Sequence, residues 1–113
     1  FLYNDYNPAL LGIILERATG MTVSEYMETR LWQQMGAEGY GSWSLDSENS
    51  GFEKMFVGLN GRAIDLAKLG WLFLNNGKNG DTQVIPQAWI ELSIDNHNAI
   101  YTNRGKYANY YQN

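Results

Sequence analysis

The clearest folding signal lies in residues 7–27, which read NPALLGIILERATGMTVSEYM. Asn followed by Pro is typical of the first turn of a helix, with Asn7 as the N-cap. Apolar residues then recur at helical spacing. They are Leu11, Ile14, Leu15 and Ala18. Gly20 follows them where a helix commonly ends. The pattern therefore predicts a helix that begins at Asn7-Pro8 and ends at Gly20.

A second helix is expected to begin at Thr22. Glu25 follows three residues later, which fits a capping box between the Thr hydroxyl and the Glu carboxylate. The predicted buried stripe of this helix consists of Val23, Tyr26, Met27, Leu31 and Met35. Gly36 and Gly39 should end it.

The remainder of the chain predicts two more helices separated by turns. Residues 36–61 are rich in Gly and Ser and predict a long loop with one or two short extended pieces. A helix over 62–75, capped by Asn60, carries so many apolar residues that it should be the most buried one. Gly70 within it could allow another element to approach closely. Residues 81–85 favour a short strand. Pro86 should open the last helix, with Trp89, Ile90 and Leu92 as its anchors.

These elements indicate a mainly α fold of about four helices plus a long loop with short strands. Residues 1–113 fit a single partial domain, in which 95–113 are expected to form a loosely ordered tail. Position 1 is Phe, and the chain enters and leaves inside apolar and aromatic runs, so a piece of a larger protein is expected.

Composition excludes several classes of function. The 113 residues carry 8 Lys+Arg and 12 Asp+Glu, a net charge of −4, without a basic cluster that would bind nucleic acid. No apolar run approaches the ~20 residues of a membrane span. The absence of Cys removes disulfides and thiol catalysis, and the single His97 rules out a His-rich metal site. No metal or organic cofactor is implied.

Familiar catalytic motifs are mostly missing from these residues. There is neither a Gly-x-Ser-x-Gly elbow nor a Ser-x-x-Lys sequence, and Asp46 with Glu48 is best interpreted as two solvated loop acids. One small group stands out, because Tyr3-Asn4-Asp5 immediately precedes a helix. A Tyr there can carry a proton, but its ordinary pKa near 10 requires neighbouring cations for work near neutral pH.

Several motifs in order resemble the class C β-lactamase-like serine hydrolases. They are Phe1-x-Tyr3-Asn4-Asp5, Leu10-Leu11-Gly12, Thr19-Gly20, the run from Gly58 through Asp65 to Gly70, Asn75-Asn76-Gly77, and Val84-Ile85-Pro86 with Trp89. Residues 42–47, SWSLDS, are most similar to the branch of 6-aminohexanoate-dimer hydrolases. The resemblance implies that the chain is the helical lobe of an α+β β-lactamase/transpeptidase-like fold.

The resemblance also implies a chemistry, namely acyl transfer through an acyl-enzyme on an ester, amide or β-lactam. Tyr3 matches the motif Tyr that moves the proton of a Ser nucleophile, and Asp5 stands where the family often has Asn. Trp43 is the expected substrate-binding residue. The family's Ser-x-x-Lys is not among these 113 residues, so the chain by itself is expected to be inactive.

Two other interpretations stay open at this point. The chain could be a stand-alone helical module that binds a partner through Trp43, Trp71, Trp89 and a Tyr-rich tail. It could also be a half-enzyme that assembles with a complementary chain or as a swapped dimer. A helical lobe without its sheet should expose apolar surface and self-associate. Localisation, bacterial cytoplasm or periplasm, stays undecided.

Overall fold

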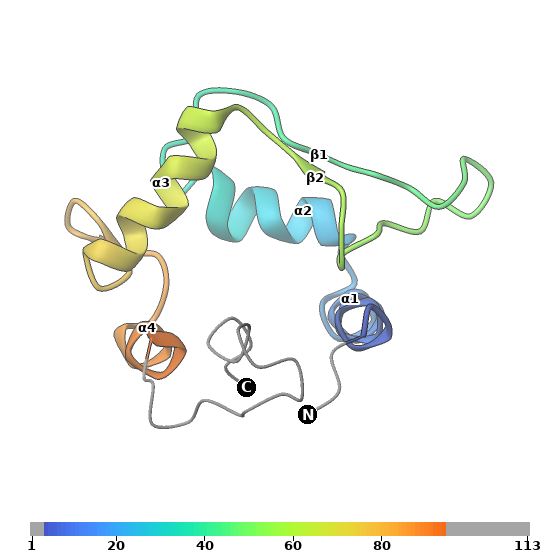
Figure 1. The fold of residues 1–113 in the computed structure, drawn as a ribbon, viewed down its shortest axis with the longest axis horizontal. Helices are drawn as coiled ribbons and strands as arrows, with labels where there is room; N and C mark the ends of the chain where they lie inside the picture. The colour runs from blue at the N-terminus through green and yellow to red at the C-terminus, as the bar shows by residue number, and fades with distance from the viewer. Residues whose placement is uncertain (1–3, 95–113) are drawn as a thin grey trace.

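A computed structural model describes residues 4–94 of the chain, and it is mainly helical. The helices are α1 (Tyr6–Thr19), α2 (Val23–Met27), the π-helix η1 (Glu28–Trp32), α3 (Ala63–Leu74) and α4 (Gln87–Ile94). The strands are β1 (Ser42–Trp43), β2 (Leu59–Asn60), β3 (Lys78–Asn79) and β4 (Thr82–Gln83). In Figure 1, α1 and α4 lie on opposite sides, while α2 and α3 connect them through the upper half of the view. Because η1 continues α2 without a break, the expected set of about four helices and a long loop with short strands is confirmed.

The first helix begins earlier than the Asn-Pro pair predicts. Asp5 is the N-cap of α1, and Asn7 and Pro8 lie inside the first turn. Pro is tolerated there because the first N–H groups of a helix have no partner within the helix. The Oδ1 of Asn4 accepts the N–H of Asn7 at 3.1 Å, so Asn4 supplies the side-chain cap. Gly20 ends the helix with φ +69°, as predicted.

The capping box at Thr22 is confirmed. The Thr22 hydroxyl accepts the Glu25 N–H at 3.1 Å, and the Glu25 carboxylate accepts the Thr22 N–H at 2.8 Å. Beyond Met27 the helix widens into η1, where the N–H of Gln33 reaches the carbonyl of Glu28. This wider turn brings Trp32, which the predicted stripe omitted, into the core.

The core is small and centres on three buried side chains from two distant parts of the chain. Trp32 is the last residue of η1, Met35 follows that helix, and Leu72 comes from α3. Leu72 is only 1% exposed, and burial of such a side chain contributes about 1.5–3 kcal/mol. Half-buried neighbours complete the cluster: Met27, Leu31, Ala37, Leu69, Val84 and Ile85.

Residues 36–61 form the long excursion, with the short extended pieces that were expected. Its ends pair as antiparallel β1 and β2, with Trp43 opposite Leu59, and Leu45 bridges Glu53 farther out. The Glu53 carboxylate accepts the N–H of Ser24 at 2.8 Å, which ties the excursion to the first turn of α2. A carboxylate there is also favoured by the positive end of the helix dipole.

The third helix exposes several of the apolar residues from which its burial was predicted. Only Asp65 and Leu72 of α3 are buried, whereas Ile64, Trp71 and Leu74 are exposed. The N-cap of α3 is Arg62, whose side chain makes no capping hydrogen bond, and not the predicted Asn60. The side-chain amide of Asn60 donates to the carbonyl of Gly58. A Cβ at Gly70 would meet no atom within 4 Å, so no described element approaches closely there.

The last described elements form a hairpin and a helix. The strand predicted over 81–85 is one arm of the β3–β4 hairpin, and α4 begins at Gln87, just after Pro86. Ile90 is buried as predicted, but Trp89 and Leu92 are exposed, so they do not anchor α4 within the described residues. The predicted tail, 95–113, lies outside the described residues, as does His97.

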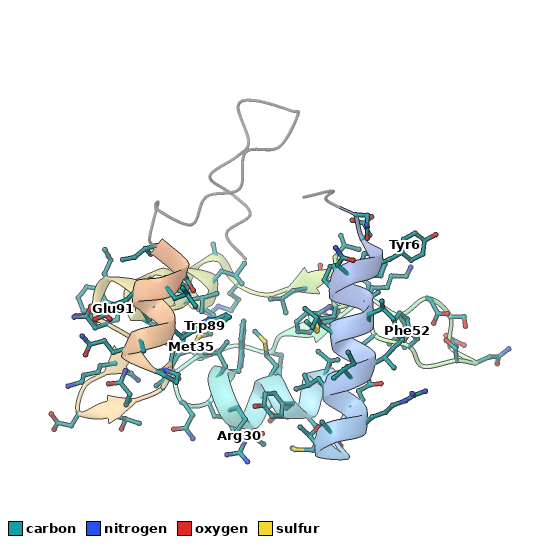
Figure 2. The ribbon with its side chains drawn as sticks, turned by 90° about the horizontal axis from the view of Figure 1, so that it is seen from below. Tyr6, Arg30, Met35, Phe52, Trp89 and Glu91 are labelled. Carbon is teal, nitrogen blue, oxygen red and sulfur yellow. The ribbon has the colours of Figure 1, made fainter. Side chains whose placement is uncertain are left out.

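Large apolar side chains are exposed on three helices. They are Tyr6, Leu10, Leu11 and Ile14 of α1, Ile64, Leu66, Trp71 and Leu74 of α3, and Trp89, Leu92 and Ile94 of α4. In Figure 2, Tyr6 points away from the other helices. Among residues 4–94, no helix has the length and apolar character needed to cross a membrane.

Candidate functional site

The segment that bears the motif Tyr is described only in part. Tyr3 itself lies outside the described residues. Asp5 is exposed at the start of α1, and its carboxylate accepts no N–H of the first turn. Its backbone carbonyl accepts the Ala9 N–H at 3.2 Å, while Asn4 supplies the cap. The Asp5 carboxylate is therefore not engaged in capping its own helix.

Gly12 of the Leu-Leu-Gly motif explains how α1 is held. It is buried, and an added Cβ would lie 3.3 Å from the Cβ of Met55 and 3.7 Å from Cγ2 of Val23. The missing side chain thus lets the excursion and α2 approach the backbone of α1. This contact fixes the helix that follows the Tyr3–Asp5 segment.

A buried carboxylate connects α3 to the turn after η1. Asp65 is 0% exposed, and its two oxygens accept the N–H groups of Glu38 at 2.8 Å and Gly39 at 3.1 Å. The Nζ of Lys68 lies 3.7 Å away. The pKa of Asp65 lies below its ordinary value, chiefly because the carboxylate accepts the N–H of Glu38. Burial raises the pKa and so opposes this effect, whereas the hydrogen bond from the Gly39 N–H lowers it further.

Lys68 extends this connection to the surface. Its Nζ donates to the Glu38 carboxylate at 2.8 Å and to the carbonyl of Gly36. The hydrogen bond and charge of Lys68 lower the pKa of Glu38. Turn 36–39 is thereby fixed by two side chains of α3.

A cavity of about 420 Å³ lies between the α2–η1 helix and the start of the excursion. Its lining residues are Ser24, Met27, Glu28, Trp32, Gln33, Ala37, Glu38, Gly39, Tyr40, Gly41, Ser42, Trp43 and Leu59. Trp43, the predicted substrate-binding residue, is half-buried in this wall. Its Nε1 donates to the carbonyl of Lys54 at 2.7 Å, which holds the indole in place.

Trp32 forms the most buried part of the cavity and was missed as a site residue. Its Nε1 donates to the carbonyl of Gly39 at 2.8 Å. Added Cβ atoms at Gly41 and Gly61 would lie 3.2 Å and 2.9 Å from its ring carbons. Two backbone segments therefore close on the indole because neither has a side chain there. Gly41 directly precedes β1 and Gly61 directly follows β2, and these two glycines are a signal in the sequence that could have indicated this arrangement.

Asp5 and Trp43 are not brought together by the described residues. The cavity that holds Trp43 is lined from α2, η1, residues 37–43 and Leu59, and no described residue of α1 takes part. Asp46 is exposed in the excursion, and a hydrogen bond from the Ser50 hydroxyl lowers its pKa. Within residues 4–94, no three His, Cys, Asp or Glu side chains gather as metal ligands would.

Comparison with known proteins finds a likeness to a hydrolase. No protein-family model matches the chain. Over 91 residues the chain is 32% identical to 6-aminohexanoate-dimer hydrolase of Paenarthrobacter ureafaciens. The match takes in 80% of this chain and 23% of that protein, so the chain spans about a quarter of the relative's length. The identity supports distant homology to a hydrolase.

Proposed function

We propose that this chain is the Tyr-bearing, helical part of a serine hydrolase that forms an acyl-enzyme on an ester, an amide or a β-lactam. The observation that carries the proposal is the 32% identity to a hydrolase over 91 residues. The order of the Tyr3, Leu-Leu-Gly and Asp65 motifs, which resembles the class C β-lactamase-like family, supports it.

Tyr3 would move the proton in this reaction. A Ser hydroxyl is a weak nucleophile at neutral pH and needs a base beside it. As phenolate, Tyr3 would take the hydroxyl proton during attack and later return it to the leaving group. A neighbouring Lys ammonium would lower the pKa of Tyr3 toward the working range.

Asp5 would orient that Lys or the substrate. It lies two residues from Tyr3, and the first turn of α1 does not use its carboxylate. An Asp in place of the family's Asn adds a negative charge, which would keep a nearby Lys protonated. This arrangement favours ester or amide substrates over specialised β-lactam hydrolysis.

The nucleophile would come from outside these 113 residues, because they contain no Ser-x-x-Lys. We therefore expect the 113-residue chain alone to be inactive. Trp43 would contact the substrate only through the cavity it lines. The substrate would be a small molecule, and the proposal requires no cofactor.

The test is ester hydrolysis by the natural polypeptide that contains these residues, with p-nitrophenyl acetate as substrate. Tyr3→Phe should lower kcat at least ~10²-fold, the usual contribution of a positioned acid–base group. Tyr6→Phe is the matched control, since Tyr6 is highly exposed on α1, and it should stay within about twofold of the parent. Unchanged kcat in Tyr3→Phe would refute the assigned role.

A further inference from the structure

We propose that the cavity beside Trp43 binds a small organic cation, an alkylammonium with a short apolar stem. The inference goes beyond the proposed hydrolase function, because no described residue of α1, the helix that follows Tyr3 and Asp5, lines the cavity. It rests on the shape of the cavity, its aromatic walls and the sign of its charged groups.

The size and walls of the cavity suit a small, partly apolar ligand. Its 420 Å³ falls within the range of about 300–1,000 Å³ usual for small-molecule sites. Trp32 and Trp43 each donate their indole N–H to a backbone carbonyl, Gly39 and Lys54 respectively. The indoles have no remaining donor for a ligand, so they offer carbon surface and π density.

The charges that line the cavity are acidic. Among the described residues of the lining, Glu28 and Glu38 are charged and no Lys or Arg is present. Glu38 is already paired with Lys68 at 2.8 Å. Glu28 takes part in no ion pair within residues 4–94, and its carboxylate accepts a hydrogen bond only from Gln33, at 3.1 Å. Its negative charge is thus available to a ligand.

A carboxylate beside aromatic walls favours a cation over an anion or a neutral molecule. Glu28 and Trp43 line the same cavity, so an ammonium there would be attracted by a carboxylate and by an aromatic face. The apolar stem can extend along Met27 and Leu59, which also line the cavity. An anion would face Glu28 without a compensating cation.

The rim of the cavity is held in place before any ligand arrives. Buried Asp65 binds the N–H groups of Glu38 and Gly39, and Gly41 closes on the Trp32 ring. A site whose wall is already ordered loses little conformational entropy on binding.

The test is a calorimetric titration of the natural polypeptide with n-butylammonium, n-butanol and butyrate, three probes with the same stem. Saturable binding of butylammonium is expected, at least tenfold tighter than butanol, with no binding of butyrate. Glu28→Gln should weaken butylammonium at least tenfold, and Trp43→Ala should do the same. Glu48→Gln, an exposed acid of the excursion outside the cavity, is the matched control and should leave affinity unchanged.

Three outcomes would overturn the proposal: no binding of butylammonium, equal binding of butanol, or unchanged affinity in Glu28→Gln. The outcome is independent of the proposed hydrolase function, because Tyr3→Phe should lose hydrolysis and keep butylammonium affinity.

Discussion

The carboxylate of Asp65 on α3 accepts the backbone N–H of Glu38 at 2.8 Å, which joins two parts of the chain 27 residues apart. A second hydrogen bond, from the Gly39 N–H to the same carboxylate, fixes the turn at 36–39. Glu38 and Gly39 of the turn line one wall of the cavity. Because Asp65 is fully buried, its polar atoms have no water to replace these partners. The residue therefore holds the third helix and the cavity rim together.

Asp65→Ala should destabilise the protein clearly and loosen the turn at 36–39. The two N–H groups of Glu38 and Gly39 would lose their acceptor, which is costly for groups away from water. Urea unfolding should give a lower midpoint than the parent. Asp81→Asn, a change at an exposed turn acid, is the control and should leave the midpoint unchanged. Equal midpoints in both variants would contradict the role of Asp65.

The stability that Asp65 contributes should depend on pH in a defined direction. Its pKa in the folded protein is lowered, chiefly by the Glu38 N–H, so the ionised form is favoured by folding. Its stabilisation is complete above the ordinary carboxyl pKa of about 4 and is lost as pH falls through the lowered folded value. Urea midpoints of the parent and Asp65→Asn, compared from pH 7 downward, should therefore converge below pH 4. A difference that grows as pH falls would contradict this sign.

Leu72→Ala should cost about 2–5 kcal/mol of unfolding free energy, since the side chain is almost fully buried beside Trp32 and Met35. Leu74→Ala is the matched control two residues along the same helix. Leu74 is 80% exposed, so its truncation should change the free energy by less than about 0.5 kcal/mol. Chemical denaturation of both variants measures the two losses of unfolding free energy. Similar losses in Leu72→Ala and Leu74→Ala would refute the placement of α3.

Gly77→Ala should destabilise the β3–β4 hairpin far more than Gly80→Ala. Both glycines have positive φ, +81° and +58°, where a side chain costs about 1–2 kcal/mol. At Gly77 the new Cβ would also clash with the carbonyl oxygen of Ile85, whereas at Gly80 it would meet nothing within 4 Å. Thermal melts compare the two variants. A larger loss in Gly80→Ala would contradict the hairpin geometry.

The exposed apolar residues of α1, α3 and α4 predict that the 113-residue chain alone self-associates. Light scattering after size exclusion should find species larger than 12.9 kDa. Ile14→Glu, on the exposed apolar face of α1, should raise the monomer share. Asn49→Glu adds the same charge to the exposed excursion and should not. A strictly monomeric parent chain would refute the prediction.

Local signals in the sequence predicted the helices well and their burial poorly. The capping box at Thr22 and the end at Gly20 depend on neighbouring residues only, and both are confirmed. The start at Asn7 was wrong because Asn4 could cap instead, and a sequence pattern does not distinguish two nearby Asn residues. α3 exposes several of the apolar residues from which its burial was predicted, because apolar content alone does not say which of them other elements cover.

The substrate-binding role of Trp43 stays a prediction. Trp43 lies in a cavity, but Trp32 and Asp65, which shape that cavity, were not chosen as site residues. The wider π-turn that carries Trp32 inward has no local signal, and the partners of Asp65 lie 26 and 27 residues away. Such contacts depend on tertiary structure. Tyr3 lies outside the described residues, so its role stays a prediction.

The most direct test of the central claim is to treat the natural polypeptide with a fluorophosphonate, which forms a covalent adduct with an activated Ser, and to locate the adduct by mass spectrometry. The account predicts one adduct, on a Ser followed by Lys three residues later, outside the 113 residues, and much slower labelling in Tyr3→Phe. No adduct, or an adduct on a Ser within residues 1–113, would contradict it.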